Sequence, residues 1–190
     1  MNKKDIPNFI SIVRILLVVP IAYTLWIQDY SVALLLFLIG GLSDGLDGFL
    51  ARRYQWETRL GVILDPMGDK LMMLAAYLLL GWHTLLPWWL VIAVILRDLI
   101  LVVGTFLYRS LIGEAKLKPL WISKLNTVCQ ILLVLIVMVS QVKTFQWTAL
   151  LSPGVEVGKW IVMMTTLLSG YAYINEWGRR AWKALKGDTV

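Results

Sequence analysis

The segment Asp44-Gly45-Leu46-Asp47-Gly48-Phe49-Leu50-Ala51-Arg52, followed by Gly61, Asp65 and Asp69, places four aspartates in two otherwise apolar stretches. Asp44 and Asp47 are three residues apart, and Asp65 and Asp69 are four residues apart. On a helix, residues at these spacings share one face. Two neighbouring helices would therefore bring four carboxylates together, and carboxylate oxygens are the ligands that hard divalent cations such as Mg²⁺ prefer.

The composition around this segment is that of a membrane protein. Of the 190 residues, 59% are hydrophobic and only 16% are charged, which leaves too little polar surface for a soluble domain. A membrane-spanning helix needs about 20 apolar residues. Six such runs are present, at residues 9–28, 31–51, 65–82, 86–108, 122–142 and 154–175. We therefore predict an all-α integral membrane bundle of six transmembrane helices with a short N-terminal juxtamembrane segment, forming one domain over residues 1–190.

Lysine and arginine gather in alternate connections between these runs. They lie at the N-terminus, at residues 52–59, at residues 109–124 and after residue 178, whereas the other connections carry few. Because basic residues concentrate on the cytoplasmic side of a membrane, both termini and the aspartates are expected there. With neither a transit peptide nor a cleavage site evident, a bacterial cytoplasmic membrane is the expected location. The net charge of +6 follows from this asymmetry, and nothing in it indicates nucleic-acid binding.

Breaks between the runs are marked by turn-forming or charged residues. The last of them is Ser152-Pro153-Gly154, which predicts that the sixth helix begins at about residue 154.

Four aspartates in membrane helices demand a physical explanation. Each costs roughly 2.5–3.5 kcal/mol at a helix centre, so they must face water, a cation or one another. Glycines among them, Gly45, Gly48 and Gly61, allow a ligand or a second backbone to approach closely. The alternative is a structural ion-pair cluster with basic neighbours such as Arg52 and Lys70.

The motif resembles that of the CDP-alcohol phosphotransferase family. The pattern D-x2-D-G-x2-A-R-x8-G-x3-D-x3-D is matched at every defined position from Asp44 to Asp69. The N-terminal residues Pro7-Asn8-Phe9-Ile10-Ser11, followed by Arg14, are similar to the family's Asn…Ser/Thr…Arg pattern. The segment 64–70 is similar to its second-half motif, with Gly68 where alanine is more usual.

This resemblance implies a transfer reaction and a set of roles. Family members move the phosphatidyl group of CDP-diacylglycerol to an alcohol and release CMP, using two Mg²⁺ or Mn²⁺ ions. Asp44 and Asp65 would bridge the ions, Asp47 and Asp69 would complete one site each, and Asp69 would also be the catalytic base. Residues expected to bind CDP-diacylglycerol are Asn8, Ser11, Gly48, Ala51, Arg52 and Thr58. By the same analogy the chain would be a homodimer.

The acceptor alcohol is indicated by a different segment. Residues 116–127, Lys-Leu-Lys-Pro-Leu-Trp-Ile-Ser-Lys-Leu-Asn-Thr, resemble a segment of CMP-forming cardiolipin synthases. Phosphatidylglycerolphosphate synthases usually carry Gly-Lys-x-Lys-Thr there. The implied acceptor is phosphatidylglycerol, giving cardiolipin and CMP, and the alternative is glycerol 3-phosphate.

Three basic residues, Arg97, Lys118 and Lys124, are candidates for binding the acceptor's phosphate. Equally, the lysines could serve topology or bulk lipid alone, and Arg97 could form a local charge pair with Asp98. A cation transporter and a non-catalytic scaffold are rival functions. The transporter is disfavoured because the aspartates are expected near one interface and no inverted repeat is visible, and the scaffold because it needs no four acids at these spacings.

Overall fold

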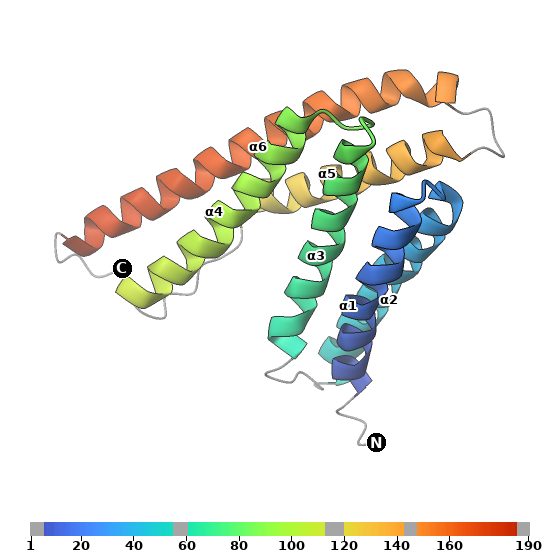
Figure 1. Ribbon diagram of the computed structural model, residues 1–190. Coiled ribbons are helices and arrows are strands. Elements are labelled where there is room, and N and C mark those ends of the chain that lie inside the picture. Colours follow the sequence, from blue (N-terminus) through green and yellow to red (C-terminus); the bar gives the residue numbers. More distant parts are fainter. Residues whose placement is uncertain (1–5, 55–60, 113–119, 143–147, 186–190) are drawn as a thin grey trace. The chain divides into compact units, whose positions relative to one another are not determined.

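The chain is helical throughout the part that a computed structural model describes, which is the backbone of residues 6–54, 61–112, 120–142 and 148–185 (Figure 1). Side chains are described for residues 12–43, 67–104, 120–142 and 150–179. Within these ranges there are six helices and no strands: α1 (Ile6–Trp26), α2 (Tyr30–Tyr54), α3 (Gly61–Trp82), α4 (Trp88–Ile112), α5 (Trp121–Gln141) and α6 (Thr148–Leu185). Each predicted apolar run falls on one of these helices, so the all-α prediction is confirmed.

Among the described residues, one helix has the length and hydropathy of a membrane-spanning segment. Within the described residues, α5 alone is long and apolar enough to span a bilayer by length and composition, with a mean hydropathy of 2.1. The described portions of α1 and α2, Ile12–Trp26 and Tyr30–Ser43, are apolar but shorter.

The chain divides into two compact units. The first comprises residues 1–85 and 134–152, and the second comprises residues 86–133 and 153–190. In the first unit α1 packs against both α2 and α3, which Figure 1 shows side by side. The core of this unit is apolar and fully buried at Ile21, Leu25, Ala33, Tyr77 and Leu80.

Glycines permit close packing in the first unit. A Cβ added at Gly40 of α2 would lie 3.1 Å from the Met72 sulfur of α3. A Cβ added at Gly68 of α3 would lie 3.3 Å from Cδ of Arg14 on α1. Such small residues let the backbones of apolar helices approach one another.

Helices α1 and α3 end in the same way and against each other. Gln28 and Thr84 both have φ of 60°. In each case two hydrogen bonds close a Schellman motif: from Gln28 N to Leu25 O and Asp29 N to Thr24 O, and from Thr84 N to Gly81 O and Leu85 N to Leu80 O. The ends meet through the stacked rings of Trp26 and Trp82, whose centroids are 6.0 Å apart. Backbone capping and aromatic contact therefore fix where both helices stop.

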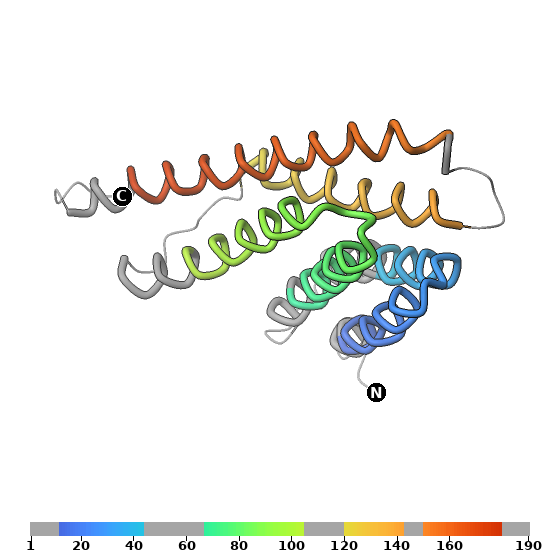
Figure 2. The backbone as a smooth tube through the Cα atoms, turned by 45° about the horizontal axis from the view of Figure 1, so that its top comes forward, coloured from blue at the N-terminus to red at the C-terminus, as the bar shows by residue number. Residues whose placement is uncertain are grey.

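The second unit is built from α4, the first part of α5 and most of α6. Figure 2 shows α6, in orange and red, running alongside α4. Its buried apolar residues include Leu90 and Val91 of α4, Leu133 of α5 and Val162 of α6. Rings of Trp89 and Trp160 lie 5.5 Å apart and join α4 to α6.

The predicted break before the sixth helix is wrong. Helix α6 begins at Thr148 and contains Pro153, so it starts before the Ser152-Pro153-Gly154 segment. Pro153 is the sixth residue of α6, just beyond the first four N–H groups that have no intrahelical partner, so it costs the helix a single backbone hydrogen bond and the helix continues through it. Gly154 lies within the helix as well, and a Cβ added there would meet open space.

Truncation of α1 at its buried face tests this packing. Leu25 is fully buried and Leu16 is 63% exposed on the same helix. We expect Leu25→Ala to lower the free energy of unfolding by about 2–5 kcal/mol, because it leaves a cavity. Leu16→Ala is the matched control and should change it by about 0.5 kcal/mol or less. Denaturant titration of the purified protein measures both, and equal losses would contradict the arrangement of α1.

Candidate active site

Both aspartate pairs lie on helices, as predicted. Asp44 and Asp47 are in α2, and Asp65 and Asp69 are in α3. Because α1 packs against both helices, the two pairs belong to one compact unit. The side chains of Asp44, Asp47 and Asp65 lie outside the described residues, as do those of the nucleotide-binding candidates Asn8, Ser11, Gly48, Ala51 and Arg52. Thr58 and Lys118 lie outside them altogether.

Asp69 is the described member of the acidic set, and it is paired with a buried arginine. Nη1 of Arg14 donates a hydrogen bond to Oδ1 of Asp69 over 3.3 Å, joining α1 to α3. The Arg14 side chain is fully buried, whereas that of Asp69 is 45% exposed. A buried guanidinium must be paired to offset its desolvation, and here the compensating charge stands at the edge of solvent.

The donor set suits a hard divalent cation. The sequence motif supplies carboxylates alone, which are oxygen ligands of the kind that Mg²⁺ and Mn²⁺ take. Asp69 is accessible enough to reach a ligand. Where side chains are described, no group of three or more potential ligands occurs, and three of the four predicted ligands lie elsewhere. The residues Asp44, Asp47, Asp65 and Asp69 would hold the ions.

In the second unit, Arg97 is a junction of three helices. This arginine of α4 is 5% exposed. It donates from Nε and Nη2 to Oγ of Ser169 on α6, at 3.2 and 2.7 Å, and from Nη2 to Oγ of Ser123 on α5 at 2.5 Å. Its Nη1 donates to Oδ1 of Asp98 at 2.6 Å. The local charge pair considered from the sequence therefore exists, and the two serines make Arg97 a connection between helices as well.

Lys124 stands next to this junction in the chain. It follows Ser123 in the first turn of α5 and is exposed. Its predicted contact with an acceptor phosphate stays a prediction, as does that of Arg97.

A second polar contact binds α5 to α6 one turn further along. Oδ1 of Asn126 accepts hydrogen bonds from the hydroxyl groups of Thr165 and Thr166, at 2.8 and 3.0 Å, and all three residues are buried. The sequence analysis did not predict this contact of Asn126 with Thr165 and Thr166, nor the hydrogen bonds of Ser169 and Ser123 with Arg97. The signal was present as polar residues at helical spacing in two apolar runs, because such residues bond a neighbouring helix.

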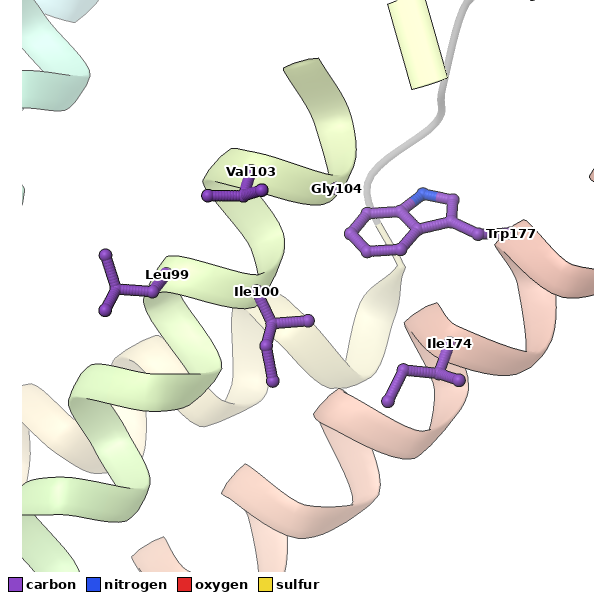
Figure 3. Close-up of a pocket in the computed structure, with 6 residues that line it drawn as sticks. All are labelled: Leu99, Ile100, Val103, Gly104, Ile174 and Trp177. Atoms are coloured by element: carbon purple, nitrogen blue, oxygen red, sulfur yellow. The ribbon is translucent and has the colours of Figure 1, made fainter. Parts of the chain in front are cut away.

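An open apolar pocket of about 510 Å³ lies between α4 and α6 (Figure 3). The ring of Trp177 covers Gly104, and a Cβ added there would overlap it. The lining residues are Leu99, Ile100, Val103, Gly104, Ile174 and Trp177.

The described part of the chain is helical, and its helices α2 and α3 each carry a pair of aspartates. The family model for CDP-alcohol phosphatidyltransferase matches residues 4–171, which include both pairs, Arg14 and Arg97. The chain therefore belongs to the CDP-alcohol phosphatidyltransferase family, as the motif predicted.

Relatives of two kinds are similar over nearly the whole chain. The CMP-forming cardiolipin synthases of Rattus norvegicus and Homo sapiens are 33% and 32% identical, over 98% and 97% of this chain. The CDP-diacylglycerol–glycerol-3-phosphate 3-phosphatidyltransferase of Bacillus subtilis is 29% identical over 96% of this chain and 97% of its own length. The chain spans 65% of the length of the two mammalian relatives.

Removing one acceptor from Arg97 tests the three-helix junction. Ser169→Ala leaves two donations of a buried guanidinium without their oxygen, so we expect the free energy of unfolding to fall by about 1–3 kcal/mol. The control is Thr127→Ala on α5, an exposed hydroxyl that bonds only its own helix at Ser123 O, with an expected change of about 0.5 kcal/mol or less. Thermal unfolding of the purified variants compares them, and an effect of Ser169→Ala no larger than the control would contradict the junction's role.

Proposed function

We propose that this protein is a membrane phosphatidyltransferase that transfers the phosphatidyl group of CDP-diacylglycerol to phosphatidylglycerol, giving cardiolipin and CMP. The observation that carries the proposal is the family's eight-position motif with its two acidic pairs on α2 and α3. The names of the two mammalian relatives, CMP-forming cardiolipin synthases, support this acceptor, and so does the segment 116–127.

The chemistry follows from the carboxylates. Two bound Mg²⁺ or Mn²⁺ ions would neutralise the pyrophosphate and stabilise charge on the attacking and leaving oxygens. Asp44, Asp47, Asp65 and Asp69 would hold them, and Arg52 would offer a forked donor for phosphate oxygens. Contacts to the rest of CDP-diacylglycerol come from Asn8, Ser11, Gly48, Ala51 and Thr58.

Asp69 has the second task of accepting a proton. The acceptor's hydroxyl oxygen forms a new ester bond to phosphorus, its proton passes to Asp69, and the bond to CMP breaks with its electron pair leaving on CMP. A carboxylate beside cations is a weak base, so the hydroxyl must be acidified where it meets the phosphoryl centre. The half-exposed position of Asp69 suits contact with an incoming hydroxyl.

The protein surface supports a bilayer location. All six helices have at least 21 residues, and at about 1.5 Å per residue this length crosses a hydrocarbon core of about 30 Å. Large apolar side chains face outward on several helices, among them Leu16, Val19, Leu42, Leu99, Met164 and Leu168. In water such a surface is unfavourable, whereas in lipid it is ordinary. We place six spans in a bacterial cytoplasmic membrane, with the termini and the aspartates on the cytoplasmic side and the protein as a homodimer.

The acceptor separates this proposal from its nearest alternative. Glycerol 3-phosphate is the acceptor in the name of the Bacillus subtilis relative. Arg97, Lys118 and Lys124 are the residues through which either acceptor's phosphate would be held. Because the alternatives share the class of reaction, a comparison of acceptors decides between them.

Purified protein with CDP-diacylglycerol and Mg²⁺ or Mn²⁺ should release CMP when phosphatidylglycerol is added. Release and the lipid product are measured together by chromatography. The control reaction contains glycerol 3-phosphate instead. Release with glycerol 3-phosphate alone would contradict the acceptor, while absence of release with either would contradict the class. Cation flux into liposomes without CMP would instead favour a transporter.

Asp69→Asn tests the proton acceptor. We expect turnover to fall by about 10²–10⁴-fold, the usual contribution of a general base, while CMP binding measured by calorimetry falls much less. Glu156→Gln is the matched control, because Glu156 is an exposed acid that pairs with Lys159, and its activity should stay at the wild-type level. Equal losses of binding and turnover in Asp69→Asn would argue against a base.

A further inference from the structure

We propose that Arg14 is a positioning residue that orients the carboxylate of Asp69 for its work at the metal site. This inference rests on the proposed function, in which Asp69 is both a metal ligand and the proton acceptor. Arg14 itself lies on α1, outside the acidic motif, and its place in the N-terminal pattern alone assigns it no task.

The first argument is the burial of Arg14. Its side chain has no exposed surface, although it lies in an apolar helix between Val13 and Ile15. A fully buried guanidinium is costly unless it is paired, and apolar residues of similar volume are often as good for stability or better. Stability alone is therefore a weak reason for an arginine at this position.

The second argument is the geometry of the pair. The two atoms are 3.3 Å apart, longer than the about 2.7–2.9 Å of a strong charge-assisted hydrogen bond. The carboxylate also keeps 45% of its surface exposed. A contact at this length directs the carboxylate, yet leaves it accessible to a cation and a hydroxyl. Metal-binding carboxylates are commonly oriented by such outer hydrogen bonds.

The third argument is that Arg14 cannot easily move. Gly68 precedes Asp69, and a Cβ there would lie 3.3 Å from Cδ and 3.7 Å from Cγ of Arg14. The arginine stem thus lies against the backbone of α3 directly beside the residue that its guanidinium contacts. Burial and this close approach limit its rotamers, so the direction imposed on Asp69 is a rigid one.

The experiment compares Arg14→Met, Arg14→Lys and the wild type. Three quantities are measured: kcat with both lipids, the dissociation constant of Mn²⁺ in the absence of substrate, and the unfolding midpoint. We expect Arg14→Met to lower kcat and Mn²⁺ affinity by about 10- to 100-fold, the usual cost of losing an outer hydrogen bond to a metal ligand. Arg14→Lys keeps a donor and a charge, so it should recover part of both losses.

Leu25→Ala is the control for loss of stability. It destabilises the same helix at a fully buried site, about 11 residues or 16 Å along α1 from Arg14. Its kcat per folded molecule and its Mn²⁺ affinity should equal those of the wild type. If Arg14→Met loses activity only in proportion to unfolded protein, as a destabilised variant does, the positioning role is overturned.

A double variant shows whether Arg14 acts through Asp69. The variant Arg14→Met with Asp69→Asn should be no slower than Asp69→Asn alone within about threefold, because residues that act as one unit are not additive. Multiplied losses would overturn the inference. If the wild type transfers no phosphatidyl group to any acceptor, the proposed function fails, and Mn²⁺ affinity in Arg14→Met still decides the role of Arg14.

Discussion

The packing of α1 against both α2 and α3 is the constraint on which the candidate site depends. The two aspartate pairs lie on α2 and α3, and those helices contact each other far less than each contacts α1. Helix α1 therefore acts as the scaffold that sets the separation of the pairs. It is held to α3 at one end by the Trp26–Trp82 stack, and toward the other by Arg14 and Gly68. Between these two ends, the buried residues of α1 and α3 are mostly apolar, among them Ile21, Leu25 and Tyr77.

The cost of burying a charged guanidinium is offset in different ways at Arg97 and at Arg14. Arg97 directs its donors to two serines and to the adjacent Asp98, so its charge is spread over short contacts that join three helices. Arg14 contacts an acid at longer distance, and that acid remains half-exposed. The first arrangement makes a rigid junction, while the second leaves a carboxylate that can take part in chemistry. This contrast is why Asp69, rather than Asp98, is the acid of interest.

The contacts of Arg97 also fix the start of α5. Ser123 and Lys124 are neighbours at the start of α5, so the bond from Arg97 to Ser123 holds the turn that presents Lys124. Any direct contact of Arg97 with a substrate phosphate would exchange a serine for the ligand. Asn126, bound by Thr165 and Thr166, holds the next turn of α5 against α6. The start of α5 is therefore fastened to α4 and α6 by neutral hydrogen bonds as well as by charge.

By itself, the sequence determined the helical class, the approximate extent of six helices and the family, because hydrophobic runs and the spacing of Asp44, Asp47, Asp65 and Asp69 are properties of local order along the chain. Local order did not show that α6 begins before Pro153, since a proline costs a helix one backbone hydrogen bond and need not end it. Nor could it pair Arg14 with Asp69, 55 residues away, or Arg97 with Ser169, 72 residues away. Those partners were decided by tertiary packing, because a buried guanidinium donates to whichever oxygen the neighbouring helix brings within reach.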